Sequence, residues 1–268
     1  MDYGTICWHE LMTTDAPGAK AFYRSFLNYG FIDLDMGEFT YSMFTEPGKP
    51  ESNEHALAGL MAMDEDRPAM WVAYILVEDL DATQARLEDL GGHVIHGPQE
   101  VPEMGRFTIF TDPSGAVVAL WESKQDPSGF PMPDNMQEGR IVWNEIHSTA
   151  PEASATFFRT LLGYGSCEME MGDQPPYLML TTPGAEEAPQ HASFGIKPLA
   201  EGEGQSHMMS YITVKDLDAT SSKIGAHGGK VVAGPMDVPN VGRFVTFQDP
   251  TGATISVFQH LHPENRCD

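Results

Sequence analysis

Cysteine, positive charge and long apolar runs are all scarce in this sequence. Its 268 residues include 3 cysteines, and 15 lysines and arginines stand against 39 aspartates and glutamates, which gives a formal net charge of -24. Cys7, Cys167 and Cys267 show no regular spacing, so the chain offers neither a disulfide framework nor a paired-cysteine metal motif. Reduced thiols are typical of a cytoplasmic protein, and we expect that location.

The charge and the absence of long apolar runs also limit the partners. An acidic chain repels phosphate backbones and anionic lipid surfaces, so we expect neither nucleic acid nor membrane as a partner. No apolar run is long enough to cross a bilayer, and the start Met1-Asp2-Tyr3 does not resemble a secretory signal. The negative charge favours solubility or, alternatively, the attraction of a cationic ligand.

What the sequence does contain is a repeat of itself. Residues 74–115 align without a gap on residues 211–252, with 22 identities in 42 positions. Trp8-His9-Glu10-Leu11 likewise returns as Trp143-Asn144-Glu145-Ile146. Solenoid repeats are much shorter than this period, so the pattern indicates a duplicated domain.

Each half has an alternating pattern of strands and helices. Asp15 can cap a helix whose apolar side chains recur at helical spacing, and Asp79 or Asp81 can cap a second helix that ends at Gly91-Gly92. The first half thus predicts two βαβββ units, with strands near residues 5–14, 31–36, 39–45, 56–63, 71–77, 94, 107–111 and 116–121. The proline- and glycine-rich stretch that follows indicates a linker. We therefore expect domains at residues 1–123 and 140–262, joined by residues 124–139.

Several of these residues, taken in order, resemble a known superfamily. They are Asp15 with Phe22-Tyr23, then Leu27-Asn28-Tyr29-Gly30, and finally Gly105-Arg106-Phe107 leading to Asp112-Pro113-Ser114-Gly115. The pattern resembles the vicinal oxygen chelate superfamily of glyoxalase I, bleomycin- and fosfomycin-resistance proteins and extradiol dioxygenases, in a tandem glyoxalase-like form. The resemblance implies an α+β fold of two tandem domains, each with two βαβββ units in a U-shaped sheet around a cleft.

The same resemblance implies metal ligands at set positions, and this chain has no suitable side chains there. The positions fall on Trp8, Val72 and Ala119 in the first half and on Trp143, Met209 and Ser256 in the second. Indole and alkyl groups offer no lone pairs to a divalent cation, and Met209 and Ser256 are weak donors. We therefore expect no metal and no other cofactor. A displaced site that uses Glu10, Glu145 or His147 is the alternative.

The strand alternation places a different set of side chains on the faces that would line each cleft. A flat or cationic small molecule would suit aromatic walls with one carboxylate. The expected ligand-binding residues are Trp8, Glu10, Tyr74, Trp121, Trp143, Glu145, His147, Tyr211 and Phe258. These aromatics could instead form core, and Glu10 could be a buried acid paired with Arg106.

The leading hypothesis for function is binding of a planar or cationic small molecule in an aromatic-lined cleft without the usual metal ligands. The alternative is a metal-dependent glyoxalase-like lyase or dioxygenase with a displaced metal. A metal-free lyase that uses Glu10 as base and a protein–protein scaffold are further options. Because one chain already carries both copies, we expect a monomer or a weak homodimer.

Overall fold

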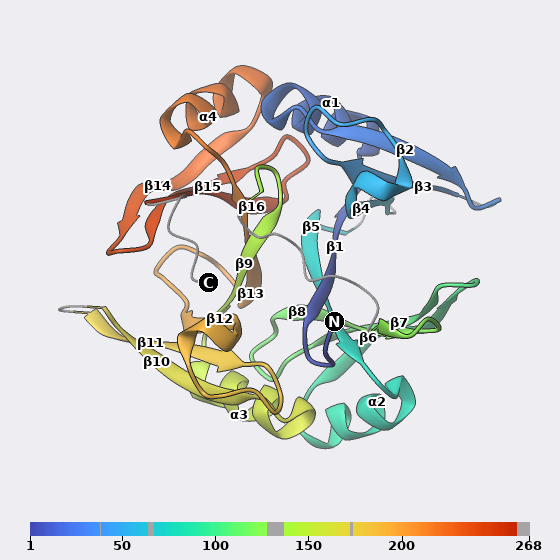
Figure 1. The fold of residues 1–268 in the computed structure, drawn as a ribbon, viewed down its shortest axis with the longest axis vertical. Helices are drawn as coiled ribbons and strands as arrows, with labels where there is room; N and C mark the ends of the chain where they lie inside the picture. Colours follow the sequence, from blue (N-terminus) through green and yellow to red (C-terminus); the bar gives the residue numbers. More distant parts are fainter. Residues whose placement is uncertain (38, 64–66, 128–136, 172–173, 262–268) are drawn as a thin grey trace. The chain divides into compact units, whose positions relative to one another are not determined.

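Each half of the chain forms one eight-stranded sheet with two helices. Figure 1 labels these elements along the chain. The computed structural model describes residues 1–37, 39–63, 67–127, 137–171 and 174–261. The expected linker is described only at its two ends, and Cys267 and the last expected domain residue, 262, lie outside the described residues. Among those described, no helix combines the length and apolar character that crossing a bilayer requires.

The first half has the element order that the sequence predicts, β1-α1-β2-β3-β4 followed by β5-α2-β6-β7-β8. Its strands lie side by side in the order β2-β3-β4-β1-β5-β8-β7-β6, with β1 parallel to β4 and β5 parallel to β8. The elements are β1 (Ile6–Thr13), α1 (Ala16–Leu27), β2 (Gly30–Asp35), β3 (Thr40–Thr45), η1 (Asn53–His55), β4 (Ala56–Ala62), β5 (Met70–Val77), α2 (Leu80–Asp89), β6 (His93–Val101), β7 (Gly105–Thr111) and β8 (Val117–Ser123).

The second half repeats this topology, with sheet order β10-β11-β12-β9-β13-β16-β15-β14. The α+β class and the tandem pairs of βαβββ units are therefore confirmed. The elements are β9 (Ile141–Ser148), α3 (Pro151–Leu162), β10 (Gly165–Met171), β11 (Gln174–Thr181), η3 (Pro189–His191), β12 (Ala192–Pro198), β13 (His207–Thr213), α4 (Leu217–Ile224), η4 (Gly225–His227), β14 (Lys230–Val238), β15 (Gly242–Gln248) and β16 (Thr254–His260).

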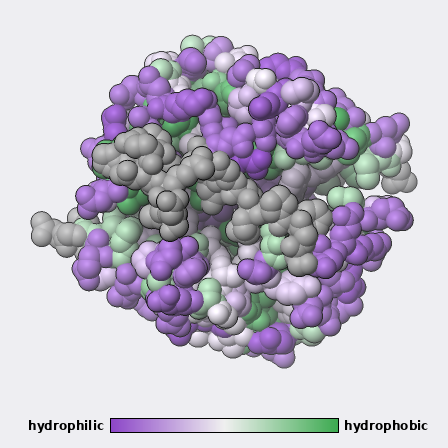
Figure 2. All heavy atoms as spheres, viewed as in Figure 1, coloured by the Kyte–Doolittle hydropathy of each residue, from purple (hydrophilic) through white to green (hydrophobic). Residues whose placement is uncertain are grey.

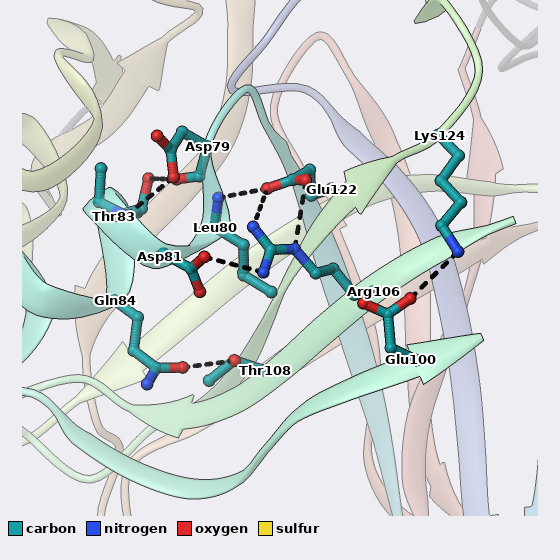
Figure 3. Close-up of polar contacts among 11 residues, drawn as sticks. Asp79, Leu80, Asp81, Thr83, Gln84, Glu100, Arg106, Thr108, Glu122 and Lys124 are labelled. Atoms are coloured by element: carbon teal, nitrogen blue, oxygen red, sulfur yellow. Dashed lines mark hydrogen bonds and ion pairs between the residues drawn. The ribbon is translucent and has the colours of Figure 1, made fainter. Parts of the chain in front are cut away.

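Local chemistry fixes where the helices begin. The Asp15 carboxylate accepts a hydrogen bond from the Gly18 N–H at 2.9 Å, which satisfies one of the unpaired donors in the first turn of α1. Asp79 does the same for α2 through the N–H of Ala82, also at 2.9 Å, and Figure 3 shows this carboxylate beside the start of the helix. Helix α3 has Ala150 at the corresponding position and receives no side-chain cap.

The apolar cores combine the two halves, although the sheets do not. One compact unit comprises the described residues within Met1–Cys7, Val72–Pro133 and Asn144–Met209, and the other those within Trp8–Trp71, Asp134–Trp143 and Ser210–Asp268. Each unit thus pairs one βαβββ unit from each half: α1 packs beside α4 in one, and α2 beside α3 in the other.

The glycines after α2 and α4 permit this packing. A Cβ at Gly92 would lie 3.0 Å from the Phe157 ring, and a Cβ at Gly229 the same distance from the Phe22 ring. The repeated glycine pairs therefore do more than stop a helix, because they also let an aromatic side chain of the neighbouring helix approach.

The surface in Figure 2 is mostly hydrophilic, with small hydrophobic patches.

Candidate functional site

A buried carboxylate on the first strand of the first half is held by a tyrosine. Glu10, on β1, is 4% exposed. The Tyr41 hydroxyl, on β3, donates to Glu10 Oε2 at 2.9 Å, and Trp8 Nε1 donates to the Tyr41 oxygen at 3.2 Å. Burial, followed by the charge of Glu10, raises the pKa of Tyr41 well above its usual value, so the phenol remains a donor. We call Trp8, Glu10 and Tyr41 the first carboxylate cluster.

The second half has the same arrangement around Glu145. The hydroxyl of Tyr177, on β11, donates to Glu145 Oε1 at 2.6 Å. The other carboxylate oxygen, Oε2, lies 3.1 Å from His147 Nε2 and 3.6 Å from Lys197 Nζ. The tyrosine–carboxylate pair thus survives in both copies of the repeat, while its surroundings differ.

A glycine makes room for each tyrosine. Gly59 pairs with Glu10 across β1 and β4, and Gly195 pairs with Glu145 across β9 and β12. A Cβ at Gly59 would overlap the Tyr41 hydroxyl, and a Cβ at Gly195 would overlap that of Tyr177. The absence of a side chain at these two positions is therefore what lets each hydroxyl reach its carboxylate.

The second half adds titratable groups that the first half lacks. His147 Nδ1 lies 3.0 Å from Glu203 Oε1, and the ring centroids of His147 and His207 are 4.8 Å apart. The corresponding first-half positions of His147, Lys197 and His207 are all methionines, namely Met12, Met61 and Met70. The same scaffold therefore presents thioethers in one half and charged or basic groups in the other.

Groups of opposite charge lie close together around Glu145 and His147. Burial opposes a charged imidazole at His147, but hydrogen bonds to Glu145 and Glu203 outweigh it and raise the pKa of His147. Burial also opposes the charge of Glu145, yet His147, Lys197 and Tyr177 together lower the pKa of this carboxyl to about 2. Burial lowers the pKa of His207, which leaves this ring neutral at pH 7. The two carboxylates beside His147 therefore favour the charged form of its imidazole.

The side chains at the superfamily's metal positions do not fit a metal. Val72 and Ala119 are buried alkyl groups, and the indole N–H of Trp8 donates to Tyr41. In the second half, the Ser256 hydroxyl is paired with that of Thr246 at 2.8 Å. A divalent cation needs several oxygen, nitrogen or thiolate lone pairs directed at one point, and these residues do not supply them. The superfamily's metal positions therefore have no ligand set for a cation in this chain.

The arginine that the sequence offered as a partner for Glu10 is held elsewhere. Arg106 Nη2 lies 2.9 Å from Glu122 Oε2, and Nη1 lies 2.9 Å from Asp81 Oδ2 (Figure 3). Arg243 repeats the arrangement with Asp218 and Asp237. The Glu10–Arg106 pairing is therefore wrong, because acidic groups beside each arginine, including one in the adjacent helix, bind the guanidinium.

The remaining expected ligand-binding residues, except Trp143, lie on other strands. Tyr74 packs against Phe107 at 5.8 Å between ring centroids, and its counterpart Tyr211 packs against Phe244 at 5.5 Å. The rings of Trp121 and Phe258 cover Gly105 and Gly242. Trp143 stands two residues before Glu145 on β9, as Trp8 does before Glu10. The roles expected for all of them stay predictions.

The sequence reasoning missed Tyr41, Tyr177, Gly59 and Gly195, as well as Lys197, Glu203 and His207. The first four were detectable, because each tyrosine and each glycine recurs at a shift of 136. Glu203 and His207 gave no such signal, because they do not recur in the first half. Their approach to His147 depends on the path of the backbone between β12 and β13.

Comparison with known proteins shows similarity to one superfamily along most of the chain. The family model described as Glyoxalase/Bleomycin resistance protein/Dioxygenase superfamily matches residues 5–120 and 140–257. "Putative glyoxylase CFP32" of Mycobacterium tuberculosis is 33% identical over 262 residues, covering 96% of this chain and 95% of the relative. "Anthracycline biosynthesis protein DauV" of a Streptomyces species is 27% identical over 272 residues, covering 96% and 93%.

Two solved structures share the fold at low sequence identity. An Mn(II)-bound glyoxalase from Novosphingobium aromaticivorans aligns with a TM-score of 0.61 and 19% identity, covering 97% of this chain and 83% of that one. The 2,3-dioxygenase LapB from Pseudomonas sp. KL28 aligns with a TM-score of 0.61 and 14% identity, covering 98% and 96%.

Proposed function

This chain belongs to the glyoxalase/bleomycin resistance protein/dioxygenase superfamily, and from that premise we propose that it binds a small organic molecule at the first carboxylate cluster. One observation supports this proposal. In each half a carboxylate accepts a hydrogen bond from a tyrosine hydroxyl, and a glycine on the neighbouring strand leaves room for that hydroxyl. Burying an acid is costly even when it is hydrogen-bonded. A duplicated chain that keeps such a group in both copies therefore has a use for it beyond packing.

The chemistry of the cluster suits a flat ligand with a cationic or hydrogen-bond-donating group. Glu10 supplies negative charge, and Trp8 supplies an aromatic surface on which a cation or a planar ring can stack. Met12 and Met61, paired across β1 and β4, add adaptable apolar side chains. In the second half, Lys197 and His147 lie beside Glu145 and would repel a cation, whereas methionines stand at the corresponding positions of the first half. We therefore assign the organic cation to the first half.

The names of the relatives support small molecules as the ligand class. One relative is named as a glyoxylase and another as an anthracycline biosynthesis protein. A thermal-shift screen with planar cations, an anthracycline and small aldehydes tests the proposal directly. We expect at least one planar cation to raise the melting temperature of the wild type but not of Glu10→Gln. Glu145→Gln, the matched variant of the second half, should respond like the wild type. Equal shifts in all three proteins, or none in any, would contradict the proposal.

A second candidate is a metal-dependent glyoxalase-like lyase or dioxygenase with a displaced metal. The observation that favours it is the group formed by His147, Glu203 and His207. Turnover of a 2-oxoaldehyde–thiol adduct or of a catechol that stops on chelation and on His207→Met would support this candidate. Activity that survives both treatments would exclude it.

A further inference from the structure

We propose that His147, Glu203 and His207 bind one divalent transition-metal ion, at a position displaced from the superfamily's own metal site. Each residue offers one ligand atom, and these atoms lie within 4.8 Å of one another. His147 comes from the end of β9, Glu203 from the segment after β12, and His207 from the first residue of β13. This inference does not depend on the organic ligand proposed above.

Each of the three side chains is already oriented by another group. His147 Nε2 lies 3.1 Å from Glu145 Oε2, so a proton on Nε2 leaves the lone pair of Nδ1 directed at Glu203. His207 Nδ1 lies 2.9 Å from the carbonyl oxygen of Gln205, which leaves its Nε2 as the donor atom. Histidines that bind metals have this pattern, with the second ring nitrogen held by a carboxylate or a backbone carbonyl.

The carboxylates of Glu203 and Glu145 are also held by hydrogen bonds. Glu203 Oε2 accepts from the Ala200 N–H at 2.7 Å, which leaves Oε1 beside His147. Glu145, which orients His147, is itself held by Tyr177 and Lys197. The tyrosine–carboxylate pair that both halves share thus acts in the second half as a support for an imidazole.

The donor set indicates which ions fit. Two imidazoles and one carboxylate suit Zn²⁺, Fe²⁺, Co²⁺, Ni²⁺ or Mn²⁺, whereas Ca²⁺ and Mg²⁺ prefer all-oxygen sites. Three protein ligands leave at least one coordination position for water or a ligand, as in catalytic rather than structural zinc sites.

A structural ion triad of Glu145, His147 and Glu203 is the competing explanation. That triad accounts for one histidine and two carboxylates, but it gives no role to His207, whose ring stands 4.8 Å from that of His147. The first half provides an internal comparison, because Met12 and Met70 stand at the positions that correspond to His147 and His207. We therefore expect one ion per chain rather than two.

Metal titration of the tag-free full-length chain tests this assignment. After removal of ions with a chelator, Co²⁺ is added and the visible absorption of the bound ion is followed, while Zn²⁺ retained through dialysis is measured by elemental analysis. We expect about one equivalent, because the site has one set of ligands. His207→Met and Glu203→Gln should each weaken binding about 100-fold or more, since loss of outer supporting groups alone costs roughly 10- to 100-fold.

The controls separate metal binding from folding. His227→Gln removes an exposed histidine distant in sequence and should bind Co²⁺ like the wild type. The Glu203 side chain is partly exposed, and the isosteric Gln change is expected to leave the circular dichroism spectrum unchanged. Wild-type protein that retains no ion, or variants that bind as tightly as the wild type, would overturn the assignment. The organic-ligand proposal is tested separately, by binding measured in excess chelator, so neither result decides it.

Discussion

Glu10 and Glu145 show how the same residue acquires different chemistry from its neighbours. Both accept a hydrogen bond from a tyrosine. Glu145 also lies beside an imidazole and an ammonium group, His147 and Lys197, and the corresponding first-half residues are Met12 and Met61. The carboxylate alone does not indicate this difference, because the difference comes from residues on the same and the neighbouring strand.

Glu10→Gln should leave the fold intact. Gln keeps an oxygen that can accept from Tyr41, so we expect the free energy of unfolding to fall by about 1 kcal/mol, the difference between a charged and a neutral acceptor. Urea denaturation followed by tryptophan fluorescence measures it. A loss of about 3–5 kcal/mol would instead show that Glu10 belongs to a buried ion pair.

Gly59→Ala should destabilise the protein through Tyr41. The new methyl group would overlap the Tyr41 hydroxyl, and such overpacking typically costs about 1–3 kcal/mol. In a Tyr41→Phe background the same change should cost less, so the double-mutant cycle gives a non-zero coupling energy. Gly225→Ala, where a Cβ would meet nothing within 4 Å, is the control. Additive effects would show that Gly59 does not serve the tyrosine.

Among the elements, the helices and their caps were the most predictable part of the fold. Asp15 was expected to cap the first helix and Asp79 or Asp81 the second; Asp15 and Asp79 both accept from the backbone of the first turn. Strand positions also followed from alternation, and the predicted and observed ends differ by at most two residues for most strands of the first half. The exception is β6, which was predicted only near residue 94 and extends to Val101. The pairing of α1 with α4 and of α2 with α3 was not predictable, because apolar periodicity shows that a face is buried but not which element covers it.

The candidate site was less predictable than the fold for a related reason. The resemblance led to Trp8 and Trp143 through their spacing from the helix starts, and strand alternation then added Glu10, Glu145 and His147 on the same faces. Tyr41 and Tyr177 reach the carboxylates from β3 and β11, two strands away in each sheet. Contacts across a sheet depend on strand order, and a single sequence does not state that order.

Asp15→Ala should weaken the start of α1. Loss of an N-cap side chain costs about 0.5–2 kcal/mol, and we expect a decrease of that size in the free energy of unfolding. Thr14→Ala, a change at the exposed neighbouring residue, is the control and should be close to neutral. The uncapped start of α3 at Ala150 shows that the fold tolerates the loss. An effect no larger than that of Thr14→Ala would mean that packing alone sets the helix start.

In the molecule as a whole, the two sheets share one topology, while the residues around Glu10 and Glu145 differ. Each apolar core uses one βαβββ unit from each half, so neither half can be removed without exposing core. His147, Lys197 and His207 lie on strands of the second sheet, and methionines stand at the corresponding positions Met12, Met61 and Met70 of the first.

The tandem arrangement also predicts the oligomeric state. Because both pairs of helices, α1 with α4 and α2 with α3, are completed within one chain, no second copy is needed to cover them. We expect light scattering after size exclusion to give the mass of a monomer, with a weak dimer only at high concentration. A stable tetramer or larger assembly at micromolar concentration would be inconsistent with this expectation.

Calorimetric titration of the best planar cation from the screen, in excess chelator, tests the central claim that Glu10 binds an organic ligand without a metal. We expect one molecule to bind per chain, equally well to the wild type and to His207→Met. Glu10→Gln should bind about 10- to 100-fold more weakly, the equivalent of a charge-assisted hydrogen bond of about 1.5–3 kcal/mol. Binding that disappears in chelator, or that is equally tight in Glu10→Gln, would contradict the claim.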